Sequence, residues 1–340
     1  MESKSEPKVS ILMSVYSEPI DWIIKAIDSI LNQTFDDFEF IIINDNPSSK
    51  QLKEFLAEIS TRDNRILIIN NRENIGLTKS LNKGIAKCNG EYIARMDADD
   101  WAYPNRIRRQ VEFMDTNQDL IASSALAYSW DGKVSLNSIF RPINFEDIIT
   151  YTFTSSPFIH PLLIMRRDVL IKNDINYDEN YPRSQDYKLA VDLLQFGKIA
   201  NLSEYLLKYR VSEQQITSKF GYEQVELCKN IRRQYINNFY SKYKFGELDK
   251  DITINTIRNC EQFEYTYLTT IKPDSKELRE FKRSMNSIRR LFYYSLKSYS
   301  MKSLYNYIIS GDYFKYPYNF RRFIIILIKH FSPEFIPKLL

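Results

Sequence analysis

The stretch NGEYIARMDADDWAYPNR, residues 89–106, decides the fold, because an apolar segment in it runs directly into a group of carboxylates. Glu91 to Met96 has the composition of a buried strand. After Pro104 the apolar residues recur at helical spacing, which predicts a helix. The loop that joins this strand to this helix is therefore predicted to carry three acids, Asp97, Asp99 and Asp100.

Three carboxylates within four residues repel one another unless a cation or a donor-rich ligand lies among them. In α/β sheets ligands bind at the carboxyl ends of the strands, so this loop suggests a divalent metal and a phosphate-bearing substrate. The same residues are compatible with a solvated acidic loop in which Asp100 caps the next helix. The surrounding chain must distinguish the two interpretations.

Upstream of this stretch, apolar strand-like runs alternate with segments of helical spacing. The runs are Val9–Tyr16, Phe38–Ile43 and Arg65–Ile69. This alternation predicts an α/β fold with a mostly parallel sheet, helices on both faces and right-handed crossovers. The ends of the first, second and fourth strands should then share one rim of the sheet, which carries Ser14 to Tyr16, Asp45 and the acids.

Downstream of the acids the pattern becomes mixed. Asp131-Gly132 is a hairpin signal, and Leu162–Met165 and Tyr205–Val211 are predicted strands. Ser184–Lys188 is predicted to open a helix. Beyond about Phe220 long helical patterns rich in Tyr, Lys and Arg continue to residue 340, so the domain boundary is predicted there.

Composition excludes several classes of protein. The chain has 340 residues, 44% apolar residues and a net charge of +4, which indicates a globular protein without a nucleic-acid partner. Only 8 glycines occur, and no glycine-rich phosphate loop is present. Three widely separated cysteines indicate neither a disulfide framework nor a zinc site. Neither a signal peptide nor a spanning segment is expected, so a cytoplasmic location is predicted.

The chain resembles the family 2 glycosyltransferases, which have the GT-A fold. The stretches that carry the resemblance lie within residues 8 to 218 and keep the family's order: VSILMSVYSEP, FIIINDNPSS, NIGLTKSLNKGIAKCNGEYIARMDADD, FIHPLLIMRRDVL, RSQDYKLAVDLL and LLKYRVSEQQIT. Bacterial lipopolysaccharide and capsule enzymes, such as N-acetylglucosaminyltransferases of the lipooligosaccharide type, are especially similar. The resemblance implies a catalytic domain at 1–220, with donor-binding (8–130) and acceptor-binding (131–220) halves, and a helical region at 221–340.

The resemblance also implies a role for each matching residue. Asp186 would be the catalytic base, and Asp99 with Asp97 would bind Mn²⁺ or Mg²⁺. The acceptor would lie near Trp101, His160 and Gln185. The nucleotide-sugar donor would be bound by Ser14, Tyr16, Glu18, Asp45, Lys79, Asp97, Ala98 and Arg210.

Each of these roles has a structural alternative when the residues are taken alone. Asp186 suits the first turn of a helix, where the macrodipole favours a carboxylate. Asp45 suits a turn, and His160 suits a loop or a core position. Trp101 suits half-buried packing, although an aromatic ring beside the acids could also form the floor of a sugar site.

The sequence departs from the common family pattern in three places. The acidic pair after the second strand is Asn44-Asp45, and the pair before the catalytic helix is Gln185-Asp186. The Y-R-x-H motif near the end of the domain is Tyr209-Arg210-Val211-Ser212, so its histidine is replaced by Ser212. Arg210 is still expected to reach the diphosphate.

The resulting hypothesis is an inverting transferase that moves a sugar from a UDP-sugar to a lipid-linked saccharide during bacterial surface polysaccharide synthesis. The three departures favour one alternative, a degenerate transferase that serves as a binding or scaffold subunit. A nucleotidyltransferase would need a glycine-rich basic loop where this chain has Tyr16-Ser17-Glu18-Pro19. A processive synthase would need a Q-x-x-R-W motif and spanning helices, which the sequence lacks.

The C-terminal segment Tyr318–Ile336 has an apolar run, Phe323–Ile328, between basic residues. A basic helix of this kind can lie in the interface of the inner leaflet of a membrane. Packing of the same helix on the catalytic domain is the alternative. An interfacial position would bring a polyprenyl-linked acceptor within reach.

Overall fold

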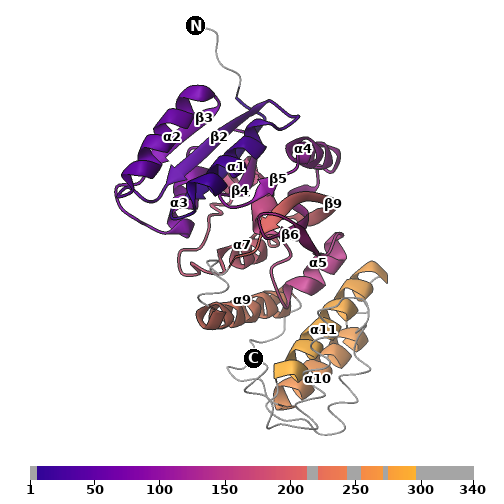
Figure 1. The fold of residues 1–340 in the computed structure, drawn as a ribbon. Coiled ribbons are helices and arrows are strands. Elements are labelled where there is room, and N and C mark those ends of the chain that lie inside the picture. Colours follow the sequence, from indigo (N-terminus) through magenta and orange to yellow (C-terminus); the bar gives the residue numbers. More distant parts are fainter. Residues whose placement is uncertain (1–5, 213–220, 243–253, 271–274, 296–340) are drawn as a thin grey trace. The chain divides into compact units, whose positions relative to one another are not determined.

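The computed structural model describes residues 6–212, 221–242, 254–270 and 275–295 (Figure 1). Within these ranges the chain forms a nine-stranded sheet with helices on both faces. The strands are β1 (Val9–Val15), β2 (Phe38–Asn44), β3 (Ile66–Asn70), β4 (Tyr92–Asp97), β5 (Trp101–Ala102), β6 (Leu120–Trp130), β7 (Ser135–Ile139), β8 (Ile164–Arg166) and β9 (Lys198–Arg210).

The helices that accompany the sheet begin with α1 (Ile20–Leu31), α2 (Lys50–Arg62), α3 (Leu77–Ile85) and α4 (Arg106–Thr116). The second half of the sheet is accompanied by α5 (Phe145–Thr152), the 3-10 helix η1 (His160–Leu162), α6 (Arg167–Lys172) and α7 (Gln185–Leu193). Three longer helices follow, α9 (Gly221–Lys242), α10 (Ile254–Thr270) and α11 (Ser275–Ser295). None of the described helices is both long and apolar enough to cross a bilayer.

The strand order is β3-β2-β1-β4-β8-β6-β9-β5, with β7 paired to β6. The first four strands are parallel, as the alternating pattern predicts. The chain moves outward from β1 to β2 and β3, then crosses back to place β4 on the other side of β1. In an open α/β sheet such a reversal marks the crevice in which a ligand usually binds, here at the carboxyl ends of β1 and β4.

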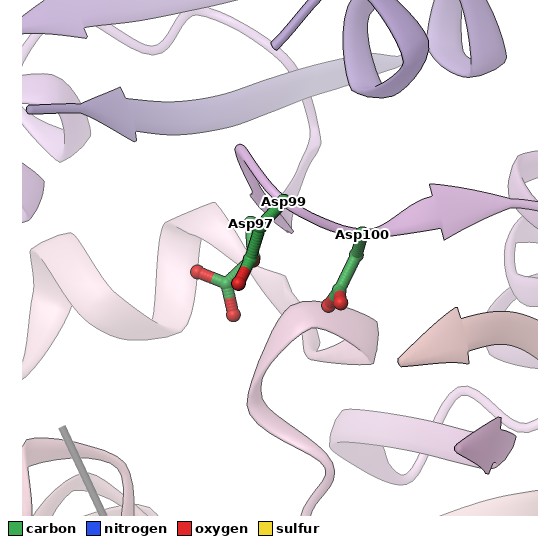
Figure 2. A group of neighbouring side chains, drawn as sticks. All are labelled: Asp97, Asp99 and Asp100. Atoms are coloured by element: carbon green, nitrogen blue, oxygen red, sulfur yellow. The ribbon is translucent and has the colours of Figure 1, made fainter. Parts of the chain in front are cut away.

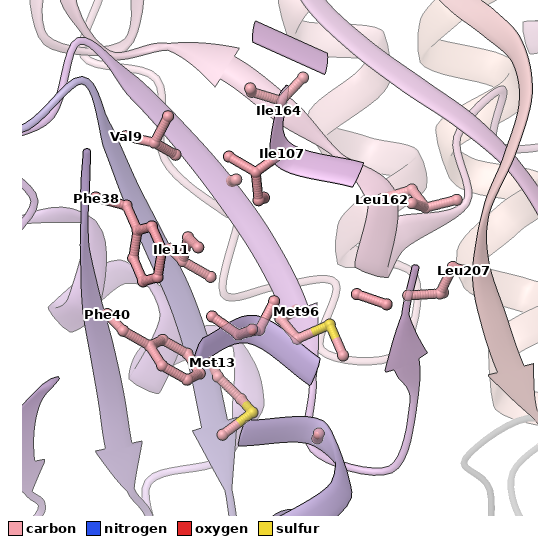
Figure 3. Close-up of a cluster of buried hydrophobic side chains, with 14 of the residues drawn as sticks. Val9, Ile11, Met13, Phe38, Phe40, Met96, Ile107, Leu162, Ile164 and Leu207 are labelled. Atoms are coloured by element: carbon pink, nitrogen blue, oxygen red, sulfur yellow. The ribbon is translucent and has the colours of Figure 1, made fainter. Parts of the chain in front are cut away.

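Two hydrophobic cores cover the two faces of the sheet. On one face Val9, Ile11 and Met13 of β1 pack with residues of α1, α2 and α4, as part of the cluster in Figure 3. On the other face Leu12 packs with residues of α3, α6 and α7. Because successive side chains of a strand point to opposite faces, strands as rich in apolar residues as β1 and β4 require both faces of the sheet to be covered.

The second half of the sheet differs in detail from the sequence prediction. The predicted strand Leu162–Met165 is a 3-10 turn followed by the three-residue β8, which pairs antiparallel with both β4 and β6. The predicted strand Tyr205–Val211 is the end of a longer strand, β9. The hairpin signal at Asp131-Gly132 is confirmed, since β6 and β7 pair antiparallel on either side of it.

The chain divides into two compact units. One comprises Met1–Ile148 and Ser155–Ile231, and the other comprises Ile149–Thr154 and Arg232–Leu340. The division thus falls inside α5 and α9. The predicted interfacial segment, residues 318–336, lies outside the described residues.

Candidate active site

The acidic cluster lies where β4 ends at the crevice. Asp97 is the last residue of β4, and Asp99 and Asp100 lie on the turn before β5. One oxygen from each of the three carboxylates lies within 4.8 Å of the others, and Figure 2 shows the side chains pointing to the same side of the turn. The interpretation of Asp100 as a helix cap is wrong, because α4 begins at Arg106 with Asn105 at its cap position.

The electrostatics of this cluster suit a bound cation. Burial, together with the charges of Asp97 and Glu18, raises the pKa of Asp99 to about 7. Burial and the neighbouring acids also raise the pKa of Asp100, which is 1% exposed. In the part of the chain that the structure describes, Asp100 Oδ2 has no hydrogen-bond partner. A set of hard oxygen ligands with one buried oxygen unsatisfied fits Mg²⁺ or Mn²⁺.

The loop after β1 lies beside these acids. Ser14 is in register with Asp97 on the adjacent strand. The Tyr16 N–H donates to Glu18 Oε2 at 2.8 Å, while the Tyr16 side chain is 47% exposed. Burial raises the pKa of Glu18, and the charge of Asp97 raises it further. The structure therefore brings Ser14 and Glu18 to the same crevice as the acids, as the topology predicts.

Asp45 is buried at the end of β2, where its carboxylate organises a neighbouring loop. Oδ1 accepts from Asn71 Nδ2 at 2.7 Å and from the Ile75 N–H at 2.9 Å, and Oδ2 accepts from the Gly76 N–H at 2.9 Å. These bonds hold the chain where α3 begins. Lys79, on α3, is exposed, and its Nζ lies 3.9 Å from a carboxylate oxygen of Glu179.

Ala98 and Trp101 have different surroundings from those of the acids. Ala98 as a whole is 2% exposed and belongs to the hydrophobic core, so little of this residue is accessible to a donor. Trp101 packs edge-on against Tyr103, with ring centroids 5.1 Å apart, and Lys208 Nζ lies 4.7 Å from the centre of its ring.

Arg95 is a member of the site that the sequence analysis missed. It is 2% exposed, lies two residues before Asp97 on β4, and forms an ion pair with that carboxylate. Because alternate residues of a strand share a face, the spacing itself places both side chains together. A charged residue inside an otherwise apolar strand was the signal in the sequence, since a buried guanidinium requires a partner.

The half-buried His160 and the buried Tyr177 form a hydrogen-bonded pair. His160 Nε2 lies 2.8 Å from the Tyr177 hydroxyl oxygen. Burial and the charge of Arg95 hold the pKa of His160 well below its ordinary value. His160 is therefore neutral at physiological pH, and its ring serves as a hydrogen-bonding partner of Tyr177.

Asp186 lies in the first turn of α7, after Ser184 at the cap position. Burial raises the pKa of Asp186 despite a hydrogen bond from the Ser156 side chain, so desolvation outweighs the expected effect of the helix macrodipole. Burial raises the pKa of Tyr177, and the charges of Asp186 and Asp97 both raise it further. Beside Asp186, Gln185 Oε1 is buried with no hydrogen-bond partner among the described residues.

Arg210 ends β9 and contacts the acidic turn directly. Its Nε donates to the Asp99 carbonyl oxygen at 2.7 Å, and its backbone N–H donates to Asp100 Oδ1 at 2.7 Å. The residue expected to reach a diphosphate thus hydrogen-bonds with the turn that carries the acids.

Comparisons with known proteins identify the family. A family model described as Glycosyl transferase family 2 matches residues 10–173. An uncharacterized glycosyltransferase of Haemophilus influenzae is 31% identical over 311 residues, which cover 89% of this chain and 90% of that protein. The chain belongs to glycosyltransferase family 2.

Two further proteins are similar to this glycosyltransferase. The O-antigen biosynthesis glycosyltransferase WbnJ of Escherichia coli is 30% identical over 243 residues, which cover 68% of this chain and 92% of the relative. The crystal structure of residues 1–349 of S. aureus TarS in complex with UDP-GlcNAc has a TM-score of 0.58, with 16% identity, and covers 95% of this chain and 91% of that one. This likeness confirms the GT-A fold of the glycosyltransferase.

Proposed function

We propose that this transferase moves a sugar from a UDP-sugar, with inversion at the anomeric carbon, to a hydroxyl of a lipid-linked saccharide during bacterial surface polysaccharide synthesis. The observation that carries the proposal is the acidic cluster at the carboxyl end of β4, in register with the end of β1. The O-antigen relative supports the polysaccharide, and the UDP-GlcNAc complex of the structural neighbour supports the donor.

In this proposal Asp99 and Asp97 hold the divalent cation. When bound, the cation supplies positive charge that stabilises the leaving diphosphate. Arg95 fixes the orientation of Asp97 through their ion pair. The Asp97 carboxylate therefore does not need to reorganise when the donor binds. Ser14, Tyr16 and Glu18 line the donor side of the crevice.

Asp186 is the proposed general base. Burial raises its pKa above the ordinary value of a carboxylic acid, and a carboxylate with a raised pKa is a stronger base towards the proton of a hydroxyl. The hydrogen bond from Ser156 restrains the carboxylate and leaves it an acceptor. Asp186 would take the proton of the acceptor hydroxyl as the oxygen attacks the anomeric carbon and the nucleoside diphosphate leaves.

Asp186→Asn tests the assignment of the base. Transfer should fall by about 10²–10⁴-fold, the usual worth of a positioned base, while nucleotide affinity should hardly change. The matched control is Asp192→Asn on the same helix, because both Asp192 oxygens lie 2.7 Å from Lys188 Nζ in a separate ion pair. Wild-type turnover in Asp186→Asn would exclude the assignment, and a joint loss of binding and folding would make Asp186 structural.

A panel of UDP-sugars tests the reaction itself. Release of UDP with Mn²⁺ or Mg²⁺, and its loss with excess chelator, is the expected result. Nucleotide binding without turnover of any donor or acceptor would instead favour the alternative of a scaffold subunit.

We also propose that the chain lies on the inner leaflet, where a lipid-linked acceptor is found. Support comes from α11, on which Arg279, Lys282 and Arg283 are exposed and occupy neighbouring positions of one helix face. Exposed cations grouped in this way are attracted to anionic lipid.

A further inference from the structure

Arg210 connects the last strand of the sheet to the acidic turn. The two donors named above, its backbone N–H and its Nε, contact successive residues of that turn, one at a carboxylate and the other at a carbonyl. In the sheet order β9 is separated from β4 by two strands, so these bonds join parts of the sheet that do not pair. Pairing of Trp101 with Lys208 brings β5 beside the same strand.

The guanidinium of Arg210 lies between two indole rings. Its central carbon is 4.2 Å from the centre of the Trp22 ring and 4.3 Å from that of Trp130. Trp22 belongs to α1, while Trp130 ends β6 directly opposite Arg210. Two aromatic faces favour a cation between them and exclude the alternative rotamers of a long side chain. The position of the guanidinium is thus fixed from both sides.

The hairpin between β6 and β7 closes around the same group. Gly132 has a φ of +100°, and a methyl group added there would lie 2.6 Å from Arg210 Nη1. A side chain at this position would therefore displace the guanidinium. Together with Trp101, which follows Asp100, the two stacking rings account for all 3 tryptophans of the chain.

We infer that Arg210 is a positioning residue that holds the Asp99–Asp100 turn in its metal-binding shape, and that Trp22 and Trp130 hold Arg210. The inference rests on the proposed function, since the turn is the proposed metal site. Three carboxylates close together repel one another and would spread the turn when no cation is bound. The two bonds from Arg210 oppose this spreading at the backbone of Asp99 and at the side chain of Asp100.

Mn²⁺ affinity without nucleotide tests the inference, measured by electron paramagnetic resonance on the full chain. Arg210→Lys keeps the positive charge but loses the planar donor that reaches Asp99. We expect its Mn²⁺ affinity to fall by about 10–100-fold, as when a partner that orients a metal ligand is removed. Lys208→Ala is the matched control, because it removes a neighbouring cation of β9 whose Nζ lies nearer to Trp101, at 4.7 Å from the ring centre, than to Trp130, at 5.8 Å.

A pair of variants at Trp22 separates positioning from a general loss of stability. Trp22→Leu removes one stacking face and should lower Mn²⁺ affinity, whereas Trp22→Phe keeps an aromatic face and should restore most of it. If Arg210→Lys fails to fold, this pair decides the question. Equal Mn²⁺ affinity in Trp22→Leu, Trp22→Phe and wild type would overturn the inference.

Two other outcomes also count against the inference, and they differ in whether the proposed function survives. Wild-type Mn²⁺ affinity in Arg210→Lys, combined with weaker UDP binding, would make Arg210 a contact of the diphosphate and leave the proposed function intact. Absence of Mn²⁺ binding by the wild-type protein would overturn both the inference and the proposed metal site.

Discussion

At the scale of single residues, the site is a set of charges that the fold holds close together. Arg95 offsets one negative charge by pairing with Asp97, yet Asp99 still has Asp97 and Glu18 near it. Burial and these neighbours raise the pKa of Asp99 to about 7, so it carries a proton in part of the population at neutral pH. A cation and a proton therefore compete for this carboxylate.

This competition predicts the pH dependence of metal binding. Below the raised pKa, Asp99 must lose its proton before it can act as a ligand, so Mn²⁺ affinity should fall by about tenfold per pH unit. Above a pH of about 7 the affinity should level off. The measurement is the Mn²⁺ dissociation constant between pH 5.5 and 8.5, with Asp99→Asn as the control that removes the dependence. A constant affinity from pH 6 to 8 would contradict the prediction.

At the scale of elements, β1 and β4 depend on a close approach at the start of β4. The Gly90 N–H donates to Ser10 Oγ at 2.8 Å. A methyl group added to Gly90 would lie 2.4 Å from the Ser10 nitrogen and 2.7 Å from the Val9 carbonyl carbon. Backbone cannot move aside as a side chain can, so only glycine allows the two strands to meet here.

Gly90→Ala should therefore destabilise the protein by about 1–3 kcal/mol, the usual cost of overpacking. The loss should be larger if the two strands separate to relieve the overpacking. Gly84→Ala is the control, because the atoms nearest to its methyl group, at 2.2 Å and beyond, belong to the Leu12 side chain and not to the backbone, and alanine gains about 1 kcal/mol of helix propensity in α3. Urea unfolding of the two variants measures the difference. A smaller loss for Gly90→Ala than for Gly84→Ala would show that the strands tolerate separation.

The elements that the sequence predicted are those whose signal is local. β1, β2 and β4 are apolar runs, and the acids follow β4 in the chain itself. The first half of β9 was missed because polar residues interrupt it. One of them is Asn201, whose buried amide accepts from the Ser124 N–H and donates to the carbonyls of Pro142 and Pro157. Such partners lie far away in the sequence.

The same distinction applies within the site. The spacing of the acids predicted their cluster, and a charge inside β4 could have indicated Arg95. The contact of Arg210 with Trp22 and Trp130 depends on three elements far apart in the chain, which no local pattern reports. Asp45 was expected on the sheet rim and lies there, but its bonds to Asn71 and the loop before α3 become evident only once that loop is placed.

At the scale of the whole molecule, the proposed function requires two properties in one chain. One compact unit contains the acidic turn and Asp186, and the other contains the exposed cations of α11. A soluble nucleotide sugar and a lipid-linked acceptor would have to meet on such a protein. Under this proposal, attachment to the membrane surface would be part of how the acceptor is supplied.

Reversing the charges at Arg279, Lys282 and Arg283 to glutamate should weaken attachment to anionic vesicles. Each cation near such a surface contributes about 1 kcal/mol, so the change should be large and salt-dependent. The control reverses three exposed cations of α2, Lys50, Lys53 and Arg62. Co-sedimentation with vesicles at low salt measures the effect. Equal binding by both variants and the wild type would rule out α11 as the attached surface.

β9 is the last strand of the sheet to be synthesised, and this order affects co-translational folding. The four parallel strands lie within residues 9–97, so they can pair while the rest of the chain is still on the ribosome. Arg210 emerges more than a hundred residues after Asp99, and the acidic turn has no such partner until then. We expect the four parallel strands of a nascent chain to form well before the chain can bind a metal ion firmly. Turnover should therefore begin only once synthesis has passed the last strand.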